Sequence, residues 1–247
     1  MPDGSGPPPY ERLAMALRRI NALAVAAVLD EDAVVDAAAV LERLGDTLAG
    51  GAGEGRRPRQ MPDPAGDPRE FFPTSPVVGL ENPVAAPVVL QIVDGAGGGP
   101  LEVRATACFD FPYEGPPGCV HGGVIAETFD ELLGSATIVA GNPGMTGTLT
   151  VRFRKPTPLR ADLTMEARYL GRDGRKVRAW GAIYHGEVLT AEAEGIFIEV
   201  GPAKLLEAAI RDGSAADPEM VATLQAEVAK ASAAGGAGSV TDTGTVA

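Results

Sequence analysis

One long apolar helix pattern, framed by strand patterns on both sides, is the feature that most constrains how this chain folds. Residues 121–140 contain the run VIAETFDELLGSATIVA, which is apolar around most of its circumference, as expected of a buried helix. Two strand patterns precede it, at 88–93 and 101–109, and four follow it. A single apolar helix must be covered on several sides, and a curved antiparallel sheet can cover it. The pattern therefore predicts an α+β fold and not a parallel sheet with alternating helices.

The four later strands are predicted from the alternation of apolar and polar residues. They are expected at 146–154, 163–169, 176–184 and 188–200. The tetrapeptide GRDG at 171–174 and the pair His185-Gly186 fit tight hairpin turns, which only antiparallel neighbours use.

The remaining segments differ from this core in composition. Arg18-Arg19 precedes a short apolar stretch that runs into acidic residues without a small-residue cleavage site, so it indicates an amphipathic helix and not a signal peptide. We expect a cytoplasmic protein. The predicted organisation is disordered residues 1–9, an N-terminal helical segment 10–48, a linker 49–75, a main domain 76–201, C-terminal helices 202–234 and a disordered tail 235–247.

Composition excludes several classes of protein. The 247 residues carry a formal net charge of −12, which argues against a general nucleic-acid binder or a protein of anionic membrane surfaces. No apolar run approaches the roughly 18 residues of a membrane-spanning helix. Cys108 and Cys119 cannot form a disulfide framework. Cys119 and His121 are two metal ligands with no cluster to complete a site, so no metal is expected.

The dipeptide Gly122-Gly123 lies where the chain enters the predicted central helix. The first N–H groups of a helix lack intrahelical partners, and glycine lets a ligand approach the backbone closely. Such a turn can hold a polarised carbonyl oxygen, as an oxyanion hole does. The alternative is a tight loop-to-helix turn without a ligand.

Asp130 is a carboxylate within a largely apolar helix, nine residues after His121. Nine residues turn a helix by two and a half turns, so the two side chains point to opposite sides. Asp130 is a candidate general base or nucleophile, and the alternative is a solvated stripe that it shares with Glu131. His121 is interpreted first as a helix-entry residue whose ring fixes the turn, and second as a base.

Several motifs together resemble the hotdog-fold acyl-CoA thioesterases, in particular the branch that includes the phenylacetate-pathway (PaaI-like) enzymes. The resemblance covers roughly residues 85–200. It is carried by His121-Gly122-Gly123, Asp130, Gly144-Met145-Thr146, Leu149-x-Val151-x-Phe153, Pro156-x-Pro158-Leu159, Gly174-Arg175-Lys176 and Ala191-Glu192-Ala193.

The resemblance implies a hotdog fold, with a curved sheet wrapped around the central helix, and a homodimer, either alone or as a dimer of dimers. It implies that the backbone N–H of Gly122 or Gly123 polarises the thioester carbonyl, and that Asp130 of the neighbouring subunit activates water or attacks directly. Thr146 falls where related enzymes place a Ser or Thr that positions the water. Some relatives carry an Asn or Gln upstream of the HGG motif, where this chain has 114–118, EGPPG.

A basic island interrupts this acidic chain. Between Met145 and Trp180, nine Arg and Lys residues stand against three acids, a local charge of +6. Such an island can attract the phosphates of CoA, and the alternative is a set of solvent-facing strand residues. The cations next to the family motifs are the expected CoA-binding residues: Arg154, Lys155, Arg175 and Lys176.

The leading functional hypothesis is hydrolysis of an acyl-CoA thioester, with no cofactor beyond the CoA of the substrate. The alternative is a hotdog module that binds acyl-CoA without cleaving it and has a regulatory or interaction role. A hotdog hydratase is disfavoured, because no histidine follows Asp130 in the helix. Acyl-CoA and a second copy of the chain are thus the expected partners.

Overall fold

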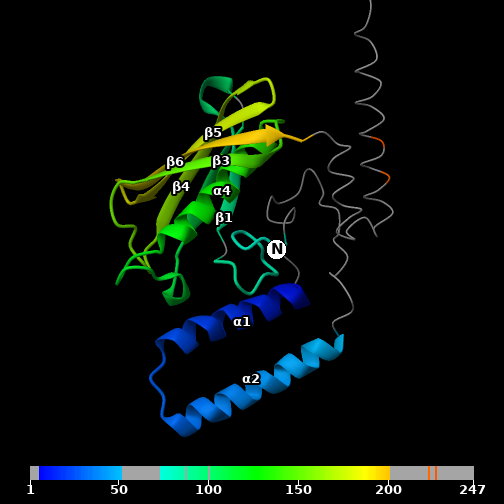
Figure 1. Ribbon diagram of the computed structural model, residues 1–247, viewed down its shortest axis with the longest axis vertical. Coiled ribbons are helices and arrows are strands. Elements are labelled where there is room, and N and C mark those ends of the chain that lie inside the picture. The colour runs from blue at the N-terminus through cyan, green and yellow to red at the C-terminus, as the bar shows by residue number, and fades with distance from the viewer. Residues whose placement is uncertain are drawn as a thin grey trace, which may run out of the picture. The chain divides into compact units, whose positions relative to one another are not determined.

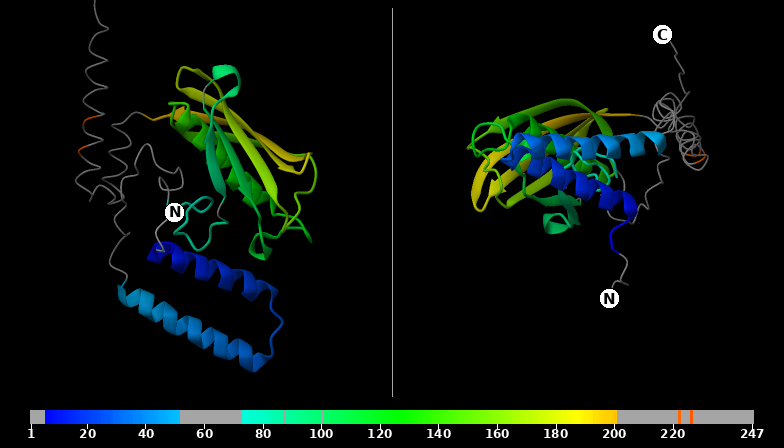
Figure 2. Two further views of the ribbon diagram at one scale, coloured as in Figure 1. Left: turned by 180° about the vertical axis from the view of Figure 1, so that it is seen from behind. Right: turned by 90° about the horizontal axis from the view of Figure 1, so that it is seen from below.

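The helix α4 (Gly122–Val139) lies against one antiparallel sheet of six strands that curves around it (Figures 1 and 2). The computed structural model of the chain describes residues 6–51, 73–86, 88–99 and 101–200, together with 222 and 226. The strands are β1 (Val89–Val93), β2 (Glu102–Ala107), β3 (Gly144–Phe153), β4 (Leu163–Asp173), β5 (Lys176–His185) and β6 (Val188–Glu199). The predicted α+β hotdog arrangement is confirmed, and each strand and the central helix begin within two residues of their predicted starts.

The strand order is β1-β2-β4-β5-β6-β3, so the first strand after the helix ends up at an edge of the sheet. β3 pairs only with β6, in a register that sets Gly144 opposite Glu199 and Phe153 opposite Ala191. A bulge interrupts this register between Thr146 and Thr148. β3 is therefore a ten-residue edge strand whose outer backbone groups have no neighbour within the sheet.

One face of α4 supplies the centre of the hydrophobic core. Phe129, Leu132, Leu133 and Ala136 are completely buried, at the three- and four-residue spacing of a single helix face. Inward-facing residues of the strands cover them, since alternate residues of a strand point to the same side. The opposite stripe of the helix is exposed and includes Gly123, Glu127, Asp130 and Ile138. The sequence suggested a helix covered on several sides, whereas the described part of the chain leaves this stripe open.

A segment of turns at 73–86 covers a further side of α4. Its Val77 and Val78 are buried in the core, and Ser75 donates a hydrogen bond from Oγ to Oε2 of Glu131 at 2.9 Å. The Tyr113 hydroxyl donates to the carbonyl oxygen of Val84 at 2.6 Å, and burial raises the pKa of Tyr113 to about 12. Ser75 is the last residue of the predicted linker 49–75, and its hydrogen bond to Glu131 attaches it to α4.

The helix α1 (Pro9–Ala26) packs on the same segment. The guanidinium of Arg18 donates to the carbonyl oxygens of Gly79, Leu80 and Asn82, the shortest of these bonds being 2.7 Å to Asn82. Ala14 on the same face of α1 is almost completely buried. Residues up to Asp30 consequently belong to the same compact unit as the sheet.

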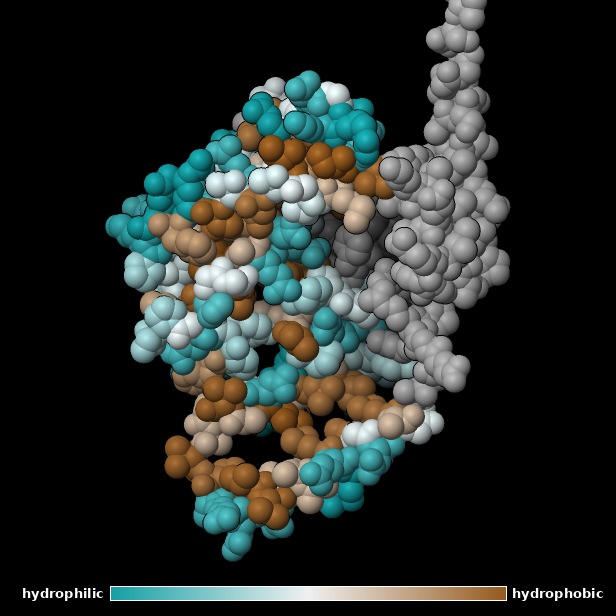
Figure 3. Space-filling view, viewed as in Figure 1, coloured by the Kyte–Doolittle hydropathy of each residue, from teal (hydrophilic) through white to brown (hydrophobic). Residues whose placement is uncertain are grey.

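The helix α2 (Glu31–Gly51) belongs to a second unit, so the predicted segment 10–48 divides near its middle. No residue of α2 is buried, and its apolar side chains contribute brown surface to the space-filling view (Figure 3). No described helix is both long enough and apolar enough to cross a membrane. The predicted C-terminal helices at 202–234 and the tail at 235–247 lie outside the described residues, apart from 222 and 226.

The contact between Ser75 and Glu131 predicts a pH dependence of stability. Burial is the largest cause and raises the pKa of Glu131 above 4.5. The Ser75 hydrogen bond lowers this pKa in part, and the charges of Asp130 and Glu127 raise it further. The folded protein therefore binds more protons than the unfolded chain above pH 4.5, and the free energy of unfolding falls as the pH rises through the folded pKa. Glu131→Gln keeps an acceptor for Ser75 and removes this fall.

We expect the stability of Glu131→Gln relative to wild type to increase between pH 4.5 and neutral pH, as measured by urea unfolding at a series of pH values. The control is Glu187→Gln, which changes an exposed turn residue. If the difference in the free energy of unfolding between wild type and Glu131→Gln does not change with pH, the raised pKa of Glu131 is contradicted.

Candidate functional site

His121 caps the N-terminus of α4. Its backbone is extended, with φ −62° and ψ 136°, and its Nδ1 accepts a hydrogen bond from the Gly123 N–H at 2.9 Å. A neutral imidazole that accepts at Nδ1 carries its proton on Nε2. The lone pair that a general base needs is thus already engaged. The structure supports the first interpretation of His121, in which the ring fixes the turn, and leaves an exposed Nε2–H donor.

Only one of the two candidate glycine amides remains available to a ligand. The Gly123 N–H is engaged by His121, whereas the Gly122 N–H has no hydrogen-bond acceptor within the described part of the chain. Gly122 is the first residue of α4, where an N–H has no intrahelical partner. Of the two amides left open by the sequence, Gly122 is thus the one whose N–H has no acceptor among the described residues.

The loop before His121 supplies no second polar side chain to this amide. Oε1 of Glu114 accepts the Gly118 N–H at 2.7 Å, so this carboxylate holds the loop closed. Gly115 packs against the backbone of His121, and a Cβ at Gly115 would lie 2.7 Å from the His121 Cα. The chain therefore has no room for a side chain at 115, which gives a physical reason why this loop lacks the polar group that some relatives carry.

Two of the predicted site residues, Asp130 and Thr146, are hydrogen-bonded to each other. The Thr146 hydroxyl donates to Oδ1 of Asp130 at 2.6 Å, and both residues are exposed within one chain. Glu131 turns away from them toward Ser75. Asp130 and Glu131 therefore do not form one solvated stripe, and of these two carboxylates Asp130 is the exposed one.

Gly122 and Asp130 do not meet within one chain. They lie eight residues apart on α4, which is about 12 Å along the helix axis. A thioester carbonyl bound at the Gly122 amide is out of reach of the Asp130 carboxylate of the same chain. The two halves of the candidate site are thus both formed, but they are separated.

The predicted CoA-binding cations divide between the two ends of the sheet. Arg154 and Lys155 follow β3 and hydrogen-bond through their backbone N–H groups to Thr190 at the start of β6. Lys176 pairs with Ile198 at the far end of β6, roughly 25 Å away at the rise of a β-strand. One chain therefore does not gather the four cations into a single site.

Acidic residues neutralise much of the basic island. Four of its nine cations form ion pairs with acids outside the segment: Arg152 with Glu194, Arg154 with Glu192, Arg160 with Asp110 and Arg172 with Glu199. The Arg168 guanidinium stacks over the Trp180 ring at 4.4 Å. The side chains of Lys155 and Lys176 form no ion pair with the described residues. Of the four predicted cations, these two have ammonium groups available to an anion.

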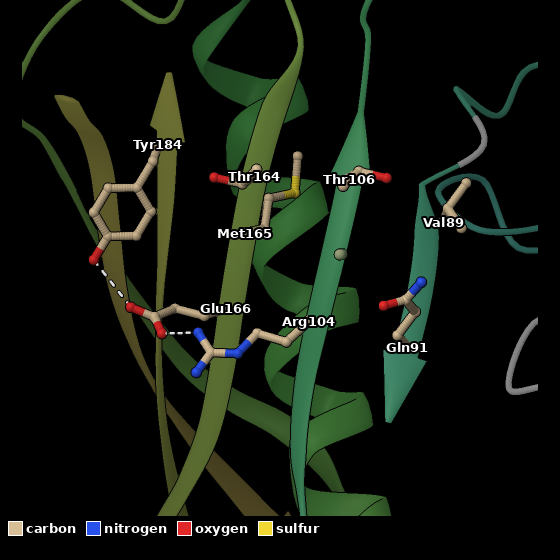
Figure 4. A pocket seen from close by; sticks show the side chains of 9 residues that line it. Val89, Gln91, Arg104, Thr106, Thr164, Met165, Glu166 and Tyr184 are labelled. Carbon is tan, nitrogen blue, oxygen red and sulfur yellow. Dashed lines mark hydrogen bonds and ion pairs between the residues drawn. The ribbon is translucent and has the colours of Figure 1, made fainter. Parts of the chain in front are cut away.

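A pocket of about 280 Å³ lies on the sheet face that points away from α4 (Figure 4). Figure 4 shows its central contacts, in which Glu166 accepts from the Tyr184 hydroxyl at 3.0 Å and forms an ion pair with Arg104. None of the predicted site residues lines it. Its Arg104 is already paired with Glu166 and Glu102, so the pocket offers no unpaired cation to a phosphate. Among the described residues, no cluster of side chains has the composition of a metal site.

Sequence comparison finds relatives among acyl-CoA thioesterases. The acyl-coenzyme A thioesterase THEM4 of Xenopus laevis is 35% identical over 94 residues, which cover 37% of this chain and 42% of the relative. THEM4 of Mus musculus is 34% identical over 110 residues, which cover 43% of this chain and 47% of the relative. The match thus spans less than half the length of these curated relatives. No family model matches the chain.

Solved structures extend the comparison over more of the chain. A putative thioesterase of Ralstonia eutropha JMP134, described as phenylacetic acid degradation-related, is 22% identical with a TM-score of 0.39, and the match covers 46% of this chain and 85% of that one. The crystal structure of a thioesterase superfamily protein is 33% identical with a TM-score of 0.67, and the match covers 80% of this chain and 93% of that one. At this identity and coverage, the chain belongs to the thioesterase superfamily.

Proposed function

We propose that the protein hydrolyses an acyl-CoA thioester to a free acid and CoA. The observation that carries the proposal is the unpartnered Gly122 amide at the start of α4, on the same helix as a carboxylate held by Thr146. Acyl-CoA thioesterase is the activity named for the THEM4 relatives. In this proposal, the Gly122 N–H donates to the thioester oxygen and stabilises the negative charge that develops there.

Asp130 acts as the general base in this proposal. Because Thr146 occupies Oδ1, the free Oδ2 of Asp130 accepts a proton from a water molecule, and the water oxygen attacks the carbonyl carbon. The tetrahedral intermediate then collapses, the C–S bond breaks and CoA leaves as a thiolate. His121 directly precedes Gly122, and its exposed Nε2–H is a donor that can stabilise this thiolate.

A second copy of the chain completes the site, because Gly122 and Asp130 of one copy are about 12 Å apart. The unpaired edge of β3 supports this assembly. A long unpaired strand edge is a template for pairing with another strand. β3 has ten residues, and its exposed side chains at the edge include Met145 and Phe153.

One antiparallel register joins both separated parts of the site. Phe153 contacts Gly122, and Thr146 contacts Asp130, so pairing Phe153 of one β3 with Thr146 of a second copy brings Gly122 toward the second Asp130. The same register places Lys155 of one copy near Met145 of the second copy. Within the second copy, Met145 pairs with Ile198 and Ile198 pairs with Lys176, so Lys155 lies at the sheet end that carries this Lys176. In this dimer the available ammonium groups approach one another and face the phosphates of CoA.

Gly122→Pro tests the proposed amide donor without removing the helix start. Proline is favoured at the first position of a helix, and the extended backbone of His121 suits the residue before a proline. Proline has no N–H, so we expect kcat for acyl-CoA hydrolysis to fall about 100- to 1,000-fold while the protein stays folded. Release of CoA thiol, followed with a thiol-trapping reagent, measures this rate.

The matched control is Gly122→Ala, which keeps the N–H and places a methyl group 3.4 Å from the Phe153 ring, an ordinary contact. This variant should lose far less activity than Gly122→Pro. Equal rates in the two variants would show that the amide is not the donor.

Asp130→Asn tests the proposed base. The variant keeps the size of the side chain and an acceptor for Thr146, but an amide does not take a proton from water, so we expect kcat to fall at least about 100-fold. Glu131→Gln neutralises the adjacent acid and should keep most of the activity, because Glu131 faces Ser75. Wild-type turnover in Asp130→Asn would exclude Asp130 as the base.

Mixing the two inactive variants tests the shared site. In a heterodimer of Gly122→Pro with Asp130→Asn, one site has both substitutions and the other has neither. Random association of equal amounts of the two chains should restore about a quarter of the wild-type activity. The measurement is thiol release by the unseparated mixture of co-expressed chains; heterodimer purified through two different affinity tags should have about half of the wild-type activity, since one of its two sites is intact. Activity that stays at the level of the separate variants would indicate a site confined to one chain.

The second candidate function is acyl-CoA binding without hydrolysis. The observation that favours it is the loop at 113–121, in which Glu114 is engaged and Gly115 has no room for a side chain, so the amide of Gly122 has no polar side chain from this loop beside it. If calorimetry shows that the protein binds an acyl-CoA and no thiol is released, the binding function is favoured. Thiol release across short, long and aryl CoA esters would favour the thioesterase.

A further inference from the structure

We propose that Phe153 selects the acyl group of the substrate, so that the protein prefers apolar acyl chains of butanoyl length and longer over acetyl. The exposed ring of Phe153 forms the apolar wall beside the Gly122 amide. This inference rests on the proposed function, since it assigns the acyl end of the same site.

The position of Phe153 follows from the pattern of β3. Leu149, Val151 and Phe153 alternate with polar residues and share one face of the strand. Leu149 and Val151 are partly buried against the hydrophobic core. Phe153 is the last residue of the strand, lies beside the first residue of α4 and is 57% exposed.

The contact with Gly122 is direct. A Cβ built on Gly122 would lie 3.4 Å from Cζ and 3.6 Å from Cε1 of Phe153. The ring therefore bounds the space beside the unpartnered amide. When a thioester oxygen accepts the Gly122 N–H, the first carbons of the acyl chain lie next to this ring.

The chemistry of the ring sets the preference. A large apolar side chain left exposed beside a polar donor gains from contact with an apolar ligand, because both lose apolar surface to water. Acetyl has one methyl group to offer, whereas longer or aryl chains can cover more of the ring. Each additional methylene in an apolar site changes kcat/KM by about tenfold or more.

The other role open to an exposed Phe on an edge strand is burial against a second copy of the chain. The proposed strand pairing centres between Leu149 and Thr150, which places Phe153 at the rim of the contact and not at its middle. The neighbour of the ring is the candidate donor itself. These two features favour the acyl group as its occupant, and the experiment separates the two roles.

The experiment compares kcat/KM for hexanoyl-CoA and acetyl-CoA in wild type, Phe153→Ala, Phe153→Gln and Phe153→Leu. We expect the hexanoyl-to-acetyl ratio to fall about tenfold in the Ala and Gln variants, and to change by less than about twofold in the Leu variant, which keeps an apolar side chain. The control is Leu170→Ala, which removes a similarly exposed apolar side chain from β4. Light scattering gives the mass of each variant, and calorimetry gives the affinity for both esters.

Three outcomes overturn the inference. The first is an unchanged ratio in the active Ala and Gln variants, which leaves the thioesterase proposal intact. The second is a ratio that changes only in variants whose mass also changes, which assigns Phe153 to the subunit contact. The third is wild-type protein without thiol release whose affinity for the two esters does not depend on Phe153. A different result would separate the two proposals. If wild-type protein releases no thiol, but its relative affinity for the two esters changes tenfold in the Ala and Gln variants, Phe153 is the selecting residue and only the proposed hydrolysis is contradicted.

Discussion

The burial of one face of α4 under the sheet is the interaction on which the rest of the structure depends. Phe129, Leu132 and Leu133 lose all contact with water, and each such side chain contributes roughly 1.5–3 kcal/mol through its apolar surface. Gly122 and Asp130 belong to the same helix, where Gly122 is half-buried at the first position and Asp130 lies on the exposed stripe. The core thus fixes the positions of both candidate groups without using either of them for packing.

The segment at 73–86 covers a further side of α4, and the helix α1 packs on this segment. Arg18 holds the segment through backbone carbonyl oxygens, which depend little on the identity of the side chains there. Ser75 and Glu131 then join the segment to α4. The carboxyl of Glu131 is used for this contact, which leaves Asp130 as the acid on the open stripe. The additional N-terminal residues of the domain therefore help to distinguish two adjacent acids.

The charge of the sheet is largely balanced by the sheet itself. Glu192, Glu194 and Glu199 of β6 pair with arginines of β3, β4 and the segment after β3. Ion pairs between exposed side chains contribute little to stability, typically below about 1 kcal/mol, but they reduce the positive potential of the basic island. Among the described residues, the cations of the island without an ion pair or ring contact are Lys155, Arg175, Lys176 and Arg178. The position of Lys155 near one end of the sheet and of Lys176 near the other adds to the argument for a dimer.

Periodicity in the sequence determined the elements and the fold class. The alternation of Leu149, Val151 and Phe153 and the helical spacing of the α4 core residues are local patterns, and a local pattern suffices to predict a strand or a helix. The same holds for His121 as the residue that fixes the start of α4. The resemblance added Asp130 and Thr146 as candidate site residues, whereas their hydrogen bond, which no spacing rule predicts across sixteen residues, is known only from the structure.

Only the tertiary structure decided which groups are available for chemistry. It engaged the Gly123 amide and left the Gly122 amide free, turned Glu131 to Ser75, and paired Arg154 with Glu192. It also placed residues 73–75 in the domain. The reason is physical: a hydrogen bond or an ion pair depends on distances of a few ångströms between atoms that are remote in the chain, whereas the sequence pattern reports only which side of its own helix or strand a residue occupies.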